Sequence, residues 1–168
     1  IPEITYGFGG AIEWKGFDVS IFFQGTARVS LFEEGSTIVP FSSGYKNNDG
    51  FLRGVMVNRW TVDNPDPNAR YPRTIRPSDA LDNNNTNKSS FWVRNASFLR
   101  LKNAEIGYTF PNRWMEKMAI QNLRLYVSGV NLLTWAPDVH LFDPDLGSGD
   151  GRKYPPTRVF NVGLNINF

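Results

Sequence analysis

The sequence predicts an all-β fold, an antiparallel transmembrane β-barrel, on three observations. Five segments alternate apolar and polar residues with a period of two, which is the pattern of strands with one apolar face. Their connections are short, long, short and long in chain order, as in barrels with short turns at one rim and long loops at the other. No apolar run approaches the roughly 20 residues of a membrane-spanning helix, and the mean hydropathy is -0.36.

Composition narrows the class of protein further. The 168 residues include 18 basic and 16 acidic ones, for a net charge of +2. Because the basic residues form no block, the sequence lacks the concentrated positive charge of a nucleic-acid-binding protein. The absence of cysteine excludes disulfides and thiolate metal sites. Aromatic residues make up 14% of the chain, and a transmembrane barrel places such residues where the membrane meets water.

The last predicted strand, residues 157–168, shows the alternation most clearly. Its apolar face carries Phe160, Val162, Leu164, Ile166 and Phe168, whereas asparagine and glycine occupy the other face. A barrel strand needs roughly 9 to 11 residues to cross a membrane, and this segment has that length. Because a soluble β-sandwich also contains strands with one apolar face, the rest of the chain has to decide between the two.

A hairpin is predicted at the start of the sequence. Every second residue from Ile4 to Trp14 is apolar or glycine, and the residues between them are almost all small or polar. After a turn at Lys15 and Gly16 the alternation resumes at Phe17. Only Phe22 breaks the pattern of this second strand.

Two further strands are predicted in the middle of the chain, one ending near residue 110 and one over residues 123–131. In the first, Leu99 and Leu101 occupy odd positions, but Ala104 and Ile106 occupy even ones. One inserted residue near 102–103 would return them to a single face, so we expect a β-bulge there. A short helix is expected after Pro111, in the connection between the two strands.

The two long connections, residues 31–90 and 132–156, are rich in Asn, Asp, Pro and Ser. The first has helical spacing only over residues 51–60. Loops of this length are uncommon in a compact domain, which argues against a small sandwich. We therefore expect two extracellular loops, with the C-terminus at the opposite, periplasmic rim.

Several motifs, in order, resemble one family. They are "ITYGF", "WKGFDVSIFFQG", "NRWTVDNPDPNARYPR" and "ASFLRLKNAEIGYTFPNRWMEKMAIQNLRLYVSGVNLLTW", followed by "FDPDLGSGDG" and "YPPTRVFNVGLNINF". Together they resemble the C-terminal end of the SusC/RagA family of TonB-dependent outer-membrane transporters. The likeness covers nearly the whole chain and depends on the order of the motifs.

The resemblance implies both a fold and a function. Transporters of this kind are plugged barrels of about 22 strands, so residues 1–168 would form the last five or so strands, with the plug and the N-terminal barrel strands outside this chain. The family imports oligosaccharides or peptides across the Gram-negative, Bacteroidetes-like outer membrane with energy from TonB. It is not an enzyme family, and no cofactor or metal is implied.

The resemblance also implies partners. They are the remainder of the transporter barrel with its plug, a SusD-like surface lipoprotein, and the TonB complex acting through the N-terminal part of the transporter. The resemblance further implies contacts with the outer-membrane barrel assembly machinery and with outer-membrane lipid.

Two groups of residues are candidate functional residues. Phe160, Val162, Leu164, Ile166 and Phe168 resemble the C-terminal signal by which the assembly machinery recognises barrels; alternatively they only face the membrane. Trp60, Tyr71, Trp135, Asp143 and Asp145 lie in or beside the long loops and are candidate contacts to a ligand or partner. Girdle or loop packing is the favoured alternative for the three aromatics.

Three other interpretations stay open at this point. Asp143 and Asp145, with Asp138 and Asp150, offer oxygens for Ca²⁺, but their spacing is not that of an EF-hand and Asp is common in turns. A secreted β-sandwich that binds carbohydrate would bury Phe8, Phe23 and Leu164 in one closed core. Only scattered carboxylates support the hypothesis of an enzyme, and the single histidine, His140, is not accompanied by the pattern of a Ser or Cys nucleophile.

Overall fold

The computed structural model describes residues 2–35, 38, 52–74, 87–115, 120–149 and 153–168. The chain divides into two compact units. The sheet unit comprises Ile1–Val29, Ser97–Pro137 and Pro156–Phe168. The loop unit comprises Ser30–Ala96 and Asp138–Pro155.

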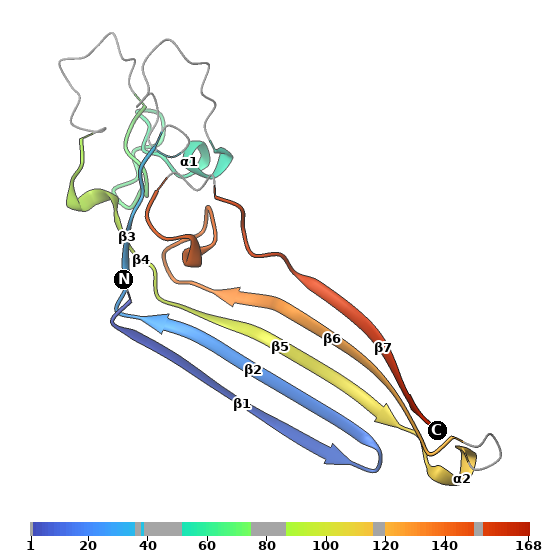
Figure 1. Ribbon diagram of the computed structural model, residues 1–168. Coiled ribbons are helices and arrows are strands. Elements are labelled where there is room, and N and C mark those ends of the chain that lie inside the picture. The colour runs from blue at the N-terminus through green and yellow to red at the C-terminus, as the bar shows by residue number, and fades with distance from the viewer. Residues whose placement is uncertain (1, 36–37, 39–51, 75–86, 116–119, 150–152) are drawn as a thin grey trace. The chain divides into compact units, whose positions relative to one another are not determined.

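The sheet unit is one antiparallel sheet of five strands in the order β1-β2-β5-β6-β7 (Figure 1). The strands are β1 (Ile4–Trp14), β2 (Phe17–Ala27), β5 (Phe98–Thr109), β6 (Asn122–Trp135) and β7 (Val159–Asn167). Neighbours in the sheet are consecutive strands of this unit, as in an up-and-down barrel wall. The predicted all-β antiparallel fold is confirmed.

The first hairpin is formed as predicted. Trp14 pairs with Phe17 across a two-residue turn, in which Lys15 has φ 48° and Gly16 has φ 88°. Positive φ at both positions is typical of a turn whose twist matches that of the flanking strands. Gly16 suits its position because the left-handed region carries no penalty for glycine.

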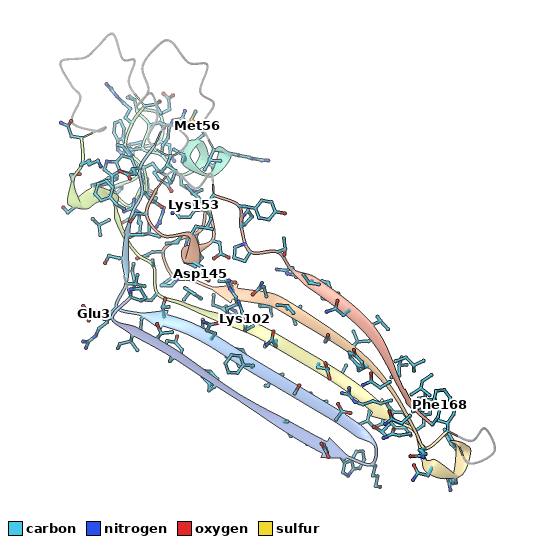
Figure 2. The ribbon with its side chains drawn as sticks, viewed as in Figure 1. Glu3, Met56, Lys102, Asp145, Lys153 and Phe168 are labelled. Carbon is cyan, nitrogen blue, oxygen red and sulfur yellow. The ribbon has the colours of Figure 1, made fainter. Side chains whose placement is uncertain are left out.

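The predicted bulge is also confirmed. In β5 the residue after Leu101 has no partner on β2, because Leu101 pairs with Phe23 and Asn103 pairs with Phe22. Lys102 is therefore the inserted residue (Figure 2). On the β6 side the register also shifts between Leu101 and Asn103.

The strand β6 is longer than predicted. The alternation stops being regular at Asn131, which has φ 55° and whose side chain donates to the Thr157 carbonyl at 3.0 Å. This irregularity faces the bulge of β5, and the strand continues beyond it to Trp135. The second connection therefore does not begin at residue 132, as the predicted boundary of 132–156 had it, but after β6.

The two ends of the sheet differ in their connections. The turn end carries the Lys15–Gly16 turn and the connection from β5 to β6, with the short helix α2 (Asn112–Met115) predicted after Pro111. β7 finishes at this end, where Gln121 donates its N–H to the Asn167 carbonyl at 2.8 Å. At the opposite end, the loop end, the chain passes between the sheet unit and the loop unit.

In the part that the structure describes, the loop unit contains paired strands and a helix, whereas an irregular course was expected over residues 31–90. It contains β3 (Ser30–Phe32) paired with β4 (Val93–Asn95), the helix α1 (Arg53–Val57), and the 3-10 turns η2 (Ser90–Trp92) and η4 (Pro144–Leu146). Its buried core is Ile38, Val55, Tyr71 and Trp92. The predicted helical turn at 51–60 is thus confirmed as α1.

Among the residues that the structure describes, no helix is long and apolar enough to cross a membrane.

Candidate functional site

One face of the sheet is apolar on all five strands, and most of its large side chains are exposed. The pairing register places the following residues on this apolar face: Ile4, Phe8, Ile12 and Trp14 of β1, Phe17, Val19, Ile21 and Phe23 of β2, Leu101, Ala104, Ile106 and Tyr108 of β5, Leu125, Val127, Leu133 and Trp135 of β6, and Phe160, Val162, Leu164 and Ile166 of β7. Val162, for example, is 76% exposed. A patch of this extent is the surface of an interaction with lipid or protein.

Exposure of the apolar face contradicts the soluble sandwich. That hypothesis requires Phe8, Phe23 and Leu164 in a closed core, but Phe8 is 53% and Leu164 is 54% exposed. Strands that are this apolar on an uncovered face are typical of a transmembrane barrel wall, whose outer band contacts hydrocarbon. The sandwich hypothesis is therefore wrong.

Aromatic side chains form two rows across the apolar face. Near the turn end, Phe17 packs on Tyr108 with ring centroids 4.6 Å apart. Toward the loop end, Phe23 stacks on Phe8 at 5.2 Å and lies 6.4 Å from Trp135. Phe23 follows Phe17 by six residues, about 20 Å of strand, so the two rows are separated along the strand direction, as the two aromatic girdles of a barrel wall are.

The other face of the sheet, the polar face, carries the charged groups. Arg124 of β6 donates to Asp18 of β2, with an Nε to Oδ1 distance of 3.0 Å, and to Glu105 of β5 at 2.7 Å. The three side chains come from three adjacent strands and are partly buried. Their pairing neutralises Arg124 and ties β2, β5 and β6 together across this face.

Large side chains on the polar face lie over glycines. Phe22, which broke the predicted pattern, covers Gly7 and Gly9: a Cβ on Gly9 would meet the Phe22 ring at 3.1 Å. Tyr126 covers Gly163 on β7 in the same way. Aromatic groups packed over cross-strand glycines stabilise register in curved sheets. Phe22 therefore has a place on the polar face, and the pairing of β1 with β2 continues through it without a shift of register.

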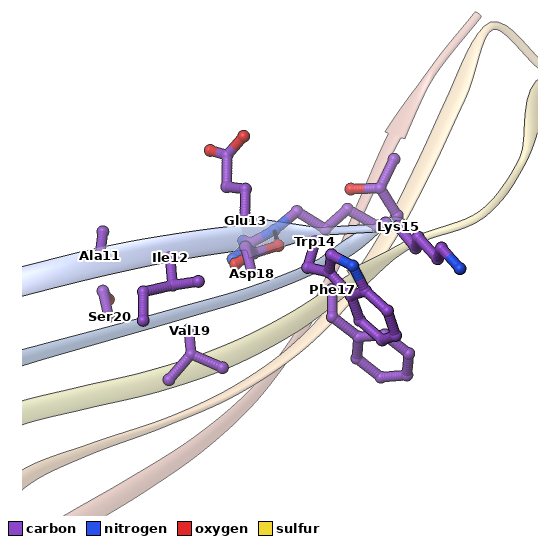
Figure 3. Close-up of a pocket in the computed structure, with 12 residues that line it drawn as sticks. Ala11, Ile12, Glu13, Trp14, Lys15, Phe17, Asp18, Val19 and Ser20 are labelled. Carbon is purple, nitrogen blue, oxygen red and sulfur yellow. Dashed lines mark hydrogen bonds and ion pairs between the residues drawn. The ribbon is translucent and has the colours of Figure 1, made fainter.

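A pocket of about 660 Å³ lies at the β1–β2 turn (Figure 3). Glu13, Lys15, Asp18 and Arg124 contribute its charged lining. The guanidinium of Arg124 is already paired with two carboxylates, so the pocket does not offer it to an anion. Within the described residues, no group of three or more His, Cys, Asp or Glu is arranged to hold a metal ion; Asp150 lies outside them.

The loop unit contains a buried ion cluster. The Glu33 side chain is 0% exposed and pairs with Arg94 at 2.9 Å and with Arg70 at 3.6 Å. Burial raises the pKa of the neighbouring Tyr71 hydroxyl, and the negative charge of Glu33 adds to this rise. The folded protein therefore favours the neutral form of the Tyr71 hydroxyl. The stability that this preference adds is fully present below the pKa of tyrosine in the unfolded chain, near 10. It is lost as pH rises through the raised pKa of Tyr71 in the folded protein.

The structure places the predicted loop contacts in four different settings. Trp60 is half-buried, and its backbone N–H donates to the backbone carbonyl of Tyr71 at 2.9 Å. Tyr71 itself is only 1% exposed and belongs to the core, so its ring offers no surface for a ligand. Trp135 is on the apolar face of β6, in the row with Phe23. Asp143 accepts from the Asp145 N–H at 3.0 Å and caps η4.

The five residues of the candidate assembly signal lie together in the structure, whereas sequence reasoning missed both ion clusters. Phe160, Val162, Leu164 and Ile166 share the apolar face of β7, and Phe168 follows the strand. Asp18, Glu105 and Arg124 sit at polar positions of alternating strands, and that pattern could have identified them. Nothing local in the sequence marks Glu33, because Arg94 is 61 residues away.

Comparison with known proteins adds sequence relatives to this geometry. No protein-family model matches the chain. A "TonB-dependent receptor P3" of Formosa agariphila is 31% identical over 180 residues, which cover 99% of this chain and 16% of that protein. "TonB-dependent receptor SusC" of Bacteroides thetaiotaomicron is 34% identical over 83 residues, covering 48% of this chain and 8% of that protein.

Solved structures agree with the sequence relatives. The chain superposes on a structure described as the RagAB peptide transporter with a TM-score of 0.69 and 26% identity, covering 99% of this chain and 17% of that one. Sequence and fold thus place the chain in the class of TonB-dependent receptors. Within that class the chain is SusC/RagA-like, and it spans 16% of the length of the first of these relatives.

Proposed function

We propose that the sheet unit is part of the wall of an outer-membrane importer of oligosaccharides or peptides that is energised through TonB. The observation that carries the proposal is the continuous exposed apolar face opposite a charged, polar face. In a bilayer the apolar face would contact lipid, and the polar face would line the lumen. Each unpaired edge N–H and C=O in hydrocarbon costs several kcal/mol, so β1 and β7 would both pair with further strands of a closed barrel.

The proposal also covers the place of these strands in the barrel, the side of the membrane on which each end lies, and the binding partners. The sheet unit forms the C-terminal strands of the barrel; the loop unit, made of the two long connections, is extracellular; and the C-terminus is periplasmic. This sidedness is supported by the rule that outer-membrane barrels have short periplasmic turns and longer extracellular loops. A SusD-like lipoprotein would dock outside, the plug would fill the lumen, and the terminal apolar residues of β7 would be read by the assembly machinery.

The proposal includes both peptide and oligosaccharide cargo, because only some of the similar proteins have names that state a cargo. One structural neighbour is described as a peptide importer, whereas the names of the sequence relatives state no cargo. The described residues of the polar face carry aromatic, amide and charged groups and do not select between the two.

The test compares two neighbouring positions of β6 in the intact receptor that contains this chain. Val127 is on the apolar face and Ser128 on the polar face of the same strand. An arginine on the lipid face near the midplane costs about 2–4 kcal/mol, whereas substitutions in the lumen act on selectivity. We expect Val127→Arg to lower the unfolding midpoint of the receptor in lipid vesicles, and Ser128→Arg to have a much smaller effect.

Equal tolerance of both arginines, or a larger loss with Ser128→Arg, would contradict the lipid-facing assignment. Urea titration of the receptor in vesicles, followed by tryptophan fluorescence, gives the unfolding midpoints. A change of electrophoretic mobility on boiling, equal to that of the parent receptor, would show that the Ser128→Arg control is assembled.

A further inference from the structure

The core of the loop unit is built from two separate connections. The first connection is Ser30–Ala96 and the second is Asp138–Pro155. The first supplies all four buried core residues, but Leu141 and Phe142 of the second pack against them. The contact is close, because a Cβ on Gly54 of α1 would meet Leu141 at 2.6 Å. Each connection therefore covers apolar surface that the other would expose alone.

Backbone hydrogen bonds also join the two connections. Gly149 donates to the Phe32 carbonyl, and Glu34 donates to the Gly149 carbonyl, both at 3.2 Å. The Phe32 N–H in turn donates to the Ser148 hydroxyl at 2.9 Å. The second connection thus pairs with the chain at the end of β3, on the segment that also holds Glu33.

The buried ion cluster lies at the same junction. Glu33 and its two arginine partners all belong to the first connection, but Arg70 also donates to the Asp138 carbonyl at the start of the second. Removing one partner from a buried ion pair leaves an uncompensated charge and is strongly destabilising. Glu33 therefore holds in place the arginine that connects the two segments.

We propose that the described parts of the two connections fold and open as one cooperative body, with the Glu33–Arg70–Arg94 cluster at its centre. Local opening in proteins occurs in contiguous cooperative units, and these contacts make the two connections one such unit although 41 residues of the sheet unit (Ser97–Pro137) separate them in sequence. A partner that binds one connection and alters its opening would alter the other to the same degree. This inference does not depend on the transported cargo.

The test uses thiol labelling, because the chain contains no cysteine. Val55 of the first connection and Val139 of the second are both buried. We would prepare Val55→Cys and Val139→Cys separately in the intact receptor and measure the rate of maleimide labelling at each position by peptide mass spectrometry. Glu33→Gln should accelerate labelling at both positions by the same factor, on the order of 100-fold.

The adjacent carboxylate provides the matched control. Glu34 is partly exposed and pairs with the exposed Lys88 at 2.9 Å, and exposed pairs contribute little. Glu34→Gln should therefore leave both labelling rates within about twofold. A folded barrel migrates differently in gel electrophoresis before and after boiling. Retention of this heat-modifiable mobility would show that the barrel is intact in both variants.

A reciprocal variant covers the case in which Glu33→Gln prevents assembly. Phe142→Ala, in the second connection, should accelerate labelling of the thiol at position 55 in the first. Acceleration confined to the connection that carries the substitution would overturn the proposal, as would unchanged rates at both positions with Glu33→Gln.

Discussion

At the scale of single residues, Phe168 is an exposed aromatic residue directly after β7. It follows the alternating residues of the strand and is 80% exposed, whereas Asn167 belongs to the opposite face. Such a terminal aromatic has no core to stabilise within the described sheet. Its value in the proposed function is recognition during assembly and contact with the membrane boundary.

Substitution of this residue should therefore affect assembly more than stability. We expect Phe168→Ala to reduce the amount of assembled, heat-modifiable receptor in the outer membrane several-fold, while Asn167→Ala leaves it near the level of the parent. Quantitative immunoblotting of membrane fractions with and without boiling measures both. Equal amounts of assembled receptor in the two variants would remove the signal role from Phe168.

Single residues also show where sequence reasoning stops. The alternation predicted the positions of Phe160 and Ile166, because strand geometry alone decides the face. It did not predict that Tyr71 is buried, because its neighbours Val55 and Trp92 come from distant parts of the chain. The Glu33 cluster was out of reach for the same reason, since it depends on tertiary contacts.

At the scale of elements, the bulge at Lys102 determines which face each half of β5 presents. Leu99 and Leu101 precede it, and Ala104 and Ile106 follow it, yet all four lie on the apolar face. A shift of one residue moves an entire strand segment to the other face. The inserted residue is therefore a requirement of the fold rather than a defect.

Deletion of Lys102 should consequently be far worse than its substitution. The deletion would place Leu99 and Leu101 on the polar face, or else break the pairing of β5 with β2 and β6. We expect no assembled receptor from the deletion variant and normal amounts from Lys102→Ala, measured by heat-modifiable mobility. Assembly of the deletion variant at the level of Lys102→Ala would show that the register is not fixed here.

Elements were predicted best where one face is apolar. The hairpin, the bulge and α1 were all predicted from local pattern and turn chemistry. The end of β6 was not, because Asn131 interrupts the alternation and Trp135 could be assigned equally well to a loop. The core of the loop unit was missed because its four buried residues are spread along the first connection without a common period, and the side chains of Leu141 and Phe142 that pack on them come from the second.

At the scale of the whole molecule, one sheet presents opposite chemistry to its two sides. Apolar side chains and two aromatic rows lie on one face, and the Arg124 cluster lies on the other. A water-soluble sheet would cover the first face with a second layer. The similarity to TonB-dependent receptors gives the reason for leaving it uncovered, since lipid would be its neighbour.

The most direct measurement is the environment of adjacent residues on two neighbouring strands, β6 and β7. Spin labels would be attached through Val127→Cys, Ser128→Cys, Val162→Cys and Asn161→Cys in the receptor reconstituted in lipid bilayers. Collision rates would then be measured with oxygen, which concentrates in the bilayer, and with a water-soluble nickel chelate. We predict high oxygen access at positions 127 and 162 and relatively greater nickel access at positions 128 and 161. Nickel access that is equally high at all four positions would contradict the account, because the apolar face would then be in water.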